Sequence, residues 1–224
     1  MPHRLLNVLD LSHRFDGRPD IAFGSFALNA GAILLARGAS GCGKSTLLHL
    51  LAGVRAIGAD SGAALLEGVD IAQLTASMRD RLRPTLVGWM PQRQFMINSL
   101  SVTDNVLLPL ALVGRVDTEA RRRAASLLDS LAILELASVR PTTLSVGQAA
   151  RACLARALLA KPKLLLADEP TASLDEASAR LVAEQILAFA ATGGAVIVAS
   201  HDRALRALLE IDAVASLAEL ELPR

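Results

Sequence analysis

A glycine-rich stretch that contains a lysine and two hydroxyl residues is the part of the sequence most suited to chemistry. Residues 38–46 read Gly-Ala-Ser-Gly-Cys-Gly-Lys-Ser-Thr, and they stand between an apolar run and an amphipathic pattern. Glycines allow successive backbone N–H groups to curl around an anion, and the N-terminus of a following helix adds its positive dipole end. A lysine in this position supplies charge for the β- and γ-phosphates of a nucleotide, and the next hydroxyl is a ligand for Mg²⁺.

This stretch predicts a phosphate-binding loop. A glycine-rich turn without a ligand is the alternative, but the lysine, the hydroxyl and the flanking patterns all argue against it. The residues expected to contact the nucleotide are Gly38, Ser40, Gly41, Cys42, Gly43, Lys44, Ser45 and Thr46.

Two adjacent carboxylates follow an apolar run further along the chain. Asp168 and Glu169 come directly after the four residues Leu-Leu-Leu-Ala, which have the character of a buried strand. Placing two acids at the tip of a buried strand is costly unless a cation is close by. We expect Asp168 to hold Mg²⁺, directly or through water, and Glu169 to orient or deprotonate an attacking water. Taken alone, the two acids could equally well cap the next turn, and it is the upstream loop that favours catalysis.

Apolar runs alternate with amphipathic patterns along most of the chain, which predicts an α/β fold with a mainly parallel sheet flanked by helices. The expected strands cover residues 5–9, 21–28, 32–36, 63–67, 86–90, 163–167, 195–199 and 211–217. The expected helices cover residues 45–51, 118–136, 146–159, 175–191 and 203–209, and Ser101 with Asp104 marks a helix start before residues 106–112. Several strand runs are continuously apolar, as expected for strands buried on both faces.

Residues 92–160 interrupt the alternation, because they are nearly all helical in pattern. We expect a single domain over residues 1–224, with a core formed by residues 1–91 and 161–224. Residues 92–160 would form a helical subdomain inserted into that core. Sites in such folds lie at the carboxyl ends of the strands.

The composition of the chain limits its possible cellular locations and ligands. The chain is 52% hydrophobic, yet its longest apolar stretch contains Pro109 and is far shorter than the roughly 20 residues that a membrane span needs. The first residues show no export signal, so the cytoplasm is expected. A net charge of +1 provides no field for nucleic acid. Cys42 and Cys153 are isolated from one another and are expected to be reduced thiols.

The order of the motifs resembles that of ABC ATPases. Leu144-Ser145-Val146-Gly147-Gln148 precedes an alanine- and arginine-rich helical pattern, and Leu-Leu-Leu-Ala-Asp-Glu-Pro-Thr-Ala-Ser-Leu-Asp follows it at residues 164–175. The resemblance extends from Phe15 to His201 and covers the whole chain. It implies a P-loop cassette with an N-terminal antiparallel β subdomain, ATP and Mg²⁺ as ligands, and ATP hydrolysis.

The resemblance also implies roles for single residues. Phe15 matches the aromatic residue that stacks on adenine, and Gln92 matches the glutamine that senses Mg²⁺ and the attacking water. His201 matches the switch histidine that contacts the γ-phosphate. Asp175 matches an aspartate at the dimer interface, although its surroundings are also an ordinary helix N-cap pattern.

The signature residues Ser145, Gly147 and Gln148 match those that contact the nucleotide held by an opposite subunit. Two ATP molecules would therefore lie between two cassettes paired head to tail. Val146 departs from the family, whose members usually have glycine there. Because a β-branched residue disfavours positive φ, the contact would be weakened if the loop required that conformation.

Residues 100–110 are similar to the corresponding region of stand-alone cassettes in the lipoprotein-releasing and macrolide-export group. This similarity implies a separate transmembrane permease, a peripheral position on the inner face of the membrane, and membrane contact only through the permease. Phe95, Met96 and Ile97 would lie near the groove that receives the permease, or else belong to the core.

Three other classes of protein are weighed against this interpretation. A soluble ABC ATPase of translation or DNA repair would usually carry two cassettes or strongly basic linkers, and neither is visible. A non-hydrolysing nucleotide clamp need not keep both water-positioning and γ-phosphate groups. A GTPase is disfavoured because no Asn-Lys-x-Asp run is present.

Overall fold

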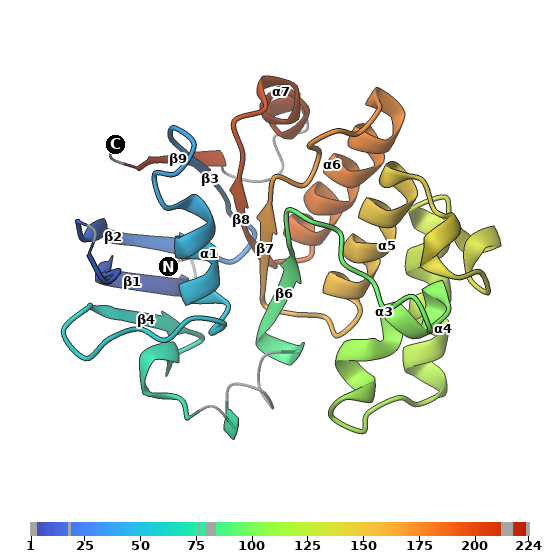
Figure 1. The fold of residues 1–224 in the computed structure, drawn as a ribbon, viewed down its shortest axis with the longest axis horizontal. Coiled ribbons are helices and arrows are strands. Elements are labelled where there is room, and N and C mark those ends of the chain that lie inside the picture. The colour runs from blue at the N-terminus through green and yellow to red at the C-terminus, as the bar shows by residue number, and fades with distance from the viewer. Residues whose placement is uncertain (1–3, 18, 76, 79–83, 212–216, 223–224) are drawn as a thin grey trace.

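The computed structural model describes residues 4–17, 19–75, 77–78, 84–211 and 217–222. Its strands form two sheets, one antiparallel and one parallel, with helices packed between and beside them (Figure 1). Within the described ranges, every helix falls short of the length and apolar character that a membrane span needs. The α/β fold that the sequence predicts is confirmed.

The antiparallel sheet is built from the N-terminal part of the chain and has the strand order β2-β1-β4-β5. Its strands are β1 (Arg4–His13), β2 (Ile21–Asn29), β4 (Ala63–Leu66) and β5 (Val69–Asp70). The expected N-terminal antiparallel unit is therefore present. The two-residue strand β5 is not predicted from the sequence, because it is too short to show a periodicity.

The parallel sheet has the order β6-β7-β8-β3-β9, and each neighbouring pair runs in the same direction. Its strands are β3 (Ile33–Arg37), β6 (Val87–Met90), β7 (Leu164–Asp168), β8 (Ala195–Ala199) and β9 (Leu217–Glu221). Successive residues alternate between two hydrophobic cores: Leu164 and Leu166 face one, while Leu165 and Ala167 face the other. Burial on both faces explains the continuous apolar runs.

The two cores are covered by different elements. The helix α1 (Lys44–Leu51) packs with the antiparallel sheet against one face of the parallel sheet. The helices on the other face are α3 (Val102–Ala111), α4 (Thr118–Ser130), α5 (Val146–Leu158), α6 (Glu176–Ala191) and α7 (Arg203–Ile211). Short 3₁₀ turns lie at Ile71–Gln73, Leu134–Leu136 and Pro141–Thr143. Figure 1 shows α3, α4 and α5 side by side at the end of the molecule away from the antiparallel sheet.

Helix starts follow the expected capping chemistry. The hydroxyl of Ser101 accepts a hydrogen bond of 3.0 Å from the backbone N–H of Asp104, which confirms the predicted start of α3. Asp117 caps α4 in the same way through the N–H of Ala120, at 2.7 Å.

Two predicted elements need correction. The helix expected over residues 118–136 ends at Ser130, because Ala132 adopts a φ of 51° and turns the chain before the 3₁₀ turn at Leu134–Leu136. The strand expected over residues 211–217 is wrong at Ile211 and confirmed at Leu217. Ile211 belongs to α7, β9 starts at Leu217, and residues 212–216 lie outside the described residues.

We expect Ala132→Gly to stabilise the protein by roughly 0.5–1 kcal/mol, because the left-handed conformation of alanine costs more than the added backbone entropy of glycine. Ala125→Gly is the matched control, since Ala125 is exposed in the middle of α4 and should lose about 1 kcal/mol. Urea unfolding measures both variants. A loss of stability in both would contradict the assigned helix end.

Candidate active site

The predicted phosphate-binding loop joins β3 to α1. Gly43 is the N-cap of α1 with a φ of 105°, and Gly38 has a φ of 143°. A Cβ atom on Gly38 would stand 2.6 Å from the Sγ of Cys42 and 3.2 Å from the carbonyl oxygen of Leu222, so position 38 has no space for a side chain. A glycine-rich turn followed by a helix start is the arrangement that usually presents backbone N–H groups to an anion.

Lys44 is held at this loop by backbone carbonyl groups. Its Nζ donates hydrogen bonds to the carbonyl oxygens of Gly38, at 2.7 Å, and of Ala39, at 3.0 Å. Cys42 is buried beneath the loop, with its Sγ 3.9 Å from the same Nζ. The ammonium charge is therefore fixed at the mouth of the loop, where phosphate oxygens would accept from it.

Asp168 is the last residue of β7, and it is only 5% exposed. Burial raises the pKa of Asp168, and the neighbouring charge of Glu169 adds to this. A hydrogen bond from the Ser45 hydroxyl and the charges of His49 and Lys44 act in the opposite direction. A buried carboxylate beside a hydroxyl oxygen is a pair of ligands that a divalent cation would stabilise.

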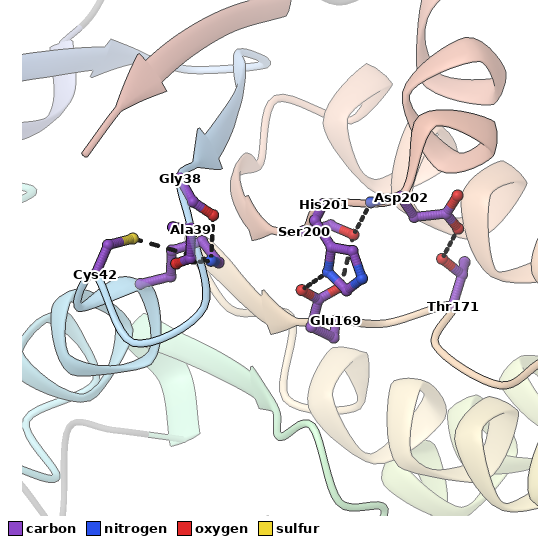
Figure 2. A network of polar contacts seen from close by, with 9 residues as sticks. Gly38, Ala39, Cys42, Glu169, Thr171, Ser200, His201 and Asp202 are labelled. Atoms are coloured by element: carbon purple, nitrogen blue, oxygen red, sulfur yellow. Dashed lines mark hydrogen bonds and ion pairs between the residues drawn. The ribbon is translucent and has the colours of Figure 1, made fainter. Parts of the chain in front are cut away.

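The carboxylate of Glu169 is anchored from both sides (Figure 2). The hydroxyl of Ser200 donates to its Oε2 at 2.8 Å, and Nδ1 of His201 lies 2.5 Å from its Oε1. Glu169 is only 6% exposed, whereas the side chain of His201 is 77% exposed. The acid is thus fixed in direction, while the histidine ring stands at the opening of the site.

The backbone at Glu169 is unusual, because this residue has a φ of 47°. Its N–H continues the sheet by donating to the carbonyl oxygen of Ala199 at 2.8 Å, and the chain then turns away from β7. A non-glycine residue in this region costs roughly 1–3 kcal/mol and persists only where the surroundings hold it. The strain coincides with the position where the sequence predicts the catalytic base.

These groups line one pocket of about 410 Å³ at the carboxyl ends of the parallel strands. The predicted residues that line it are Gly38, Ser40, Gly41, Gly43, Lys44, Ser45, Thr46, Gln92, Asp168, Glu169 and His201. Cys42 lies behind the wall, as described above. Gln92 follows β6, Asp168 and Glu169 end β7, and His201 follows β8, so three neighbouring strands deliver side chains to the phosphate loop.

Phe15 is not among the residues that line this pocket. It follows β1, where it makes an edge contact with His13 at a ring separation of 4.6 Å and lies 5.0 Å beneath the guanidinium of Arg55. Phe15 is only partly buried. Its role in stacking on adenine stays a prediction.

The signature residues are located at the start of α5, away from the pocket of the same chain. The hydroxyl of Ser145 accepts from the N–H of Gln148 at 3.2 Å, and the side chain of Gln148 accepts from the N–H of Ser145 at 2.9 Å. This capping box satisfies two backbone donors internally. Within the described ranges, the first-turn N–H groups of Val146 and Gly147 and the hydroxyl hydrogen of Ser145 have no hydrogen-bond acceptor, as is usual for N–H groups at a helix start.

Asp175 supports the signature turn from α6. Its carboxylate accepts hydrogen bonds from the N–H of Ser178, at 2.8 Å, and from the hydroxyl of Ser178, at 2.9 Å, which keep its pKa below the usual value. A Cβ atom on Gly147 would meet the Ser178 hydroxyl at 2.5 Å. Glycine at position 147 thus allows α5 to approach α6, and Asp175 is a helix N-cap as the sequence predicts.

Val146 is accommodated without backbone strain. It is the first residue of α5, and it is not one of the described non-glycine residues with positive φ. A weakened nucleotide contact is expected only if the backbone at position 146 requires a positive φ, and the backbone does not have that conformation. Val146 is 54% exposed.

Three polar residues of the site are not identified from the sequence. Ser200 is 2% exposed and binds both Glu169 and the N–H of Asp202, while Thr171 donates to Asp202 at 2.9 Å (Figure 2). Ser200 stands between an apolar strand and His201 in the sequence. This position at a strand end is the signal from which its place in the site could have been predicted. The network holds the segments after β7 and β8 together.

The residues present suit a magnesium nucleotide. The hydroxyl of Ser45, the carboxylate of Asp168 and the amide of Gln92 offer only oxygen ligands of the kind that Mg²⁺ prefers. No group of three or more metal-ligating acids, histidines or cysteines occurs within the described ranges. A site with few protein ligands fits Mg²⁺, which usually shares its coordination with water and substrate phosphates.

Fold and site together define a P-loop nucleoside triphosphatase. The ABC transporter family matches residues 24–172. The lipoprotein-releasing system ATP-binding protein LolD of Hydrogenovibrio crunogenus is 37% identical over 83% of this chain and 80% of its own length. The methionine import ATP-binding protein MetN of Mesorhizobium japonicum is 39% identical over 80% of this chain, which spans only 48% of MetN.

A solved structure supports the same assignment. The cassette MJ0796, described as a dimer in a post-hydrolysis state bound to ADP and Pi, superimposes with a TM-score of 0.79 and 25% sequence identity. The match covers 98% of this chain and 97% of MJ0796. The chain therefore belongs to the ABC transporter family. Together with the pocket, this membership makes it an ATP-hydrolysing cassette.

We expect Asp168→Asn to raise the melting temperature at pH 8 in the presence of a chelator and without nucleotide. The pKa of Asp168 is raised in the folded protein, so at a pH above this pKa the ionised carboxyl group destabilises the folded state. As the pH falls through the pKa, the carboxyl group is protonated and the destabilisation disappears. The gain should therefore shrink towards acid pH. A variant less stable than the parent at pH 8, or a gain that grows in acid, would contradict the assigned burial effect.

Proposed function

We propose that the chain works as a pair of identical cassettes that bury two ATP molecules between them and drive a separate transmembrane permease. The observation that carries this proposal is the meeting of Lys44, Asp168, Glu169 and His201 in one pocket, while Ser145 lies elsewhere in the same chain. A complete site would then need the signature turn of a second copy.

In this proposal the phosphate loop and Lys44 bind the β- and γ-phosphates. Ser45, Asp168 and Gln92 would hold Mg²⁺, which neutralises charge on the phosphates as they transfer. Glu169 accepts a proton from the attacking water or orients it, and the bonds from Ser200 and His201 fix the direction of its carboxylate. His201, exposed at the opening, contacts the γ-phosphate.

The second copy would contribute the N-terminus of α5. Two N–H groups of its first turn and the Ser145 hydroxyl would face the γ-phosphate, and the helix dipole favours the negative charge there. The interaction disappears when the γ-phosphate leaves. Closure on ATP and opening after hydrolysis then provide the mechanical step.

The helical segment 92–160 would act as a subdomain that passes this movement to the permease. Phe95, in the segment after Gln92, is 72% exposed, while Met96 next to it is 6% exposed and belongs to the core. An exposed aromatic side chain close to the pocket suits a partner contact. The chain would thus be peripheral on the inner face of the membrane, and the similarity to LolD supports a partner of the lipoprotein-releasing type.

Glu169→Gln should lower ATP turnover about 10²–10⁴-fold, because a general base contributes this much, while ATP binding is retained. The variant should also accumulate as a dimer with Mg²⁺ and ATP, as measured by sedimentation. Glu184→Gln is the matched control, because Glu184 is exposed on α6 and its substitution changes the charge by the same amount. Unchanged turnover in Glu169→Gln would contradict the role of Glu169.

A further inference from the structure

A second pocket, of about 570 Å³, lies at the opposite edge of the parallel sheet from the phosphate loop. Lys163 stands just before β7, and Gly194 stands just before β8, so the pocket is at the amino ends of these strands. Its other walls are the C-terminal parts of α4, α5 and α6. None of the groups discussed for ATP lines it. We call it the lysine pocket.

Three cationic side chains line the lysine pocket: Arg123, Lys161 and Lys163. No carboxylate is present among the described residues of its wall. Arg123 donates to the carbonyl oxygen of Leu159 at 2.8 Å and lies 3.7 Å from Glu119, yet its buried Nε has no hydrogen-bond partner in the described part of the chain. The wall therefore carries an excess of positive charge.

The two lysines are the groups available to an anion. Both are exposed, and within the described ranges neither ammonium group forms a hydrogen bond or an ion pair. Lys161 has a φ of 53°, a conformation in which glycine would be unstrained. Near the end of α6, the carbonyl groups of Ala188, Phe189 and Ala190 are already bound by the N–H groups of the three following residues, Thr192, Gly193 and Gly194, so these carbonyls do not need the lysines as caps.

The floor of the pocket is apolar. Leu127, Leu158 and Phe189 line it from three different helices. The ring of Phe189 lies directly against Gly194, where any side chain would overlap it. A concave apolar surface of this volume with a few charged groups at its rim is typical of sites for small organic ligands.

From this combination we propose that the lysine pocket binds a small organic anion, in which a carboxylate, sulfonate or phosphate is attached to an aromatic or acyl body. The charged group meets Lys161 and Lys163, and the body covers Phe189 and the two leucines. Because the walls come from both α4–α5 and the β7–α6 part of the chain, a bound ligand ties these parts together. The site is independent of the proposed catalytic roles.

The probe is anilinonaphthalene sulfonate, whose fluorescence rises when its aromatic rings leave water. It should bind the full chain saturably at one site per chain, in the presence and in the absence of ATP. The double variant Lys161→Glu/Lys163→Glu should weaken binding at least about tenfold, because it replaces attraction by repulsion at the rim. Arg121→Glu/Arg122→Glu, on the exposed face of α4, makes the same charge change and should leave binding unaltered.

Two further ligands test the charged part and the apolar part of the interaction separately. Inorganic sulfate, which lacks an apolar body, and phenylnaphthylamine, which lacks the charge, should each bind at least about tenfold more weakly than the sulfonate. The proposal is overturned if the sulfonate does not saturate, if both double variants lose binding equally, or if the uncharged amine binds as well as the sulfonate. Circular dichroism confirms that both double variants are folded.

Discussion

The active site depends on one constraint: a parallel sheet buried on both faces can place polar side chains only where its strands end. β6, β7 and β8 are neighbours and run in the same direction, so their carboxyl ends meet at one edge, beside the loop that leaves β3. Because the apolar interior of the sheet lowers the local dielectric constant, an unpaired charge there has a large free-energy cost. Lys44, Asp168 and Glu169 stand together at that edge. The ammonium donates hydrogen bonds to backbone carbonyls, and both carboxylates accept hydrogen bonds from serine hydroxyls.

In the proposed pair of cassettes, the same constraint would leave the site of a single chain incomplete. The hydrogen-bond donors at the start of α5 belong to a helix that covers the face of the parallel sheet away from the antiparallel sheet. They are not part of the pocket around Lys44. The capping box and the close packing of Gly147 on Ser178 fix this helix start in a conformation ready to meet an anion. In the proposed function this helix start is one half of the site, and the surface of a second copy brings the phosphate to it. This is the physical reason for expecting a pair of cassettes.

Much of this architecture can be predicted from the sequence, because the decisive signals are local. Continuous apolar runs identify the buried strands, and Gly43-Lys44-Ser45 identifies a loop whose chemistry is carried by the backbone. What the sequence does not show arises from contacts between distant segments or from single dihedral angles. Ala132 ends α4 by adopting a positive φ that alanine seldom takes, while the apolar pattern continues past it. Ser200 gains its role only because β7 and β8 are adjacent, and the place of Phe15 depends on packing against Arg55.

The proposed sharing of one site between two chains can be tested directly by mixing two variants that should each be inactive alone. Lys44→Ala removes the ammonium group proposed to bind the phosphates, and Ser145→Arg should block the signature turn. A pair formed by either variant alone should therefore have two defective sites. A mixed pair contains one site in which the Lys44 of one chain faces the Ser145 of the other. We predict that ATP hydrolysis reappears on mixing and rises with the fraction of mixed pairs. No activity at any mixing ratio, or full activity of Ser145→Arg alone, would contradict the account.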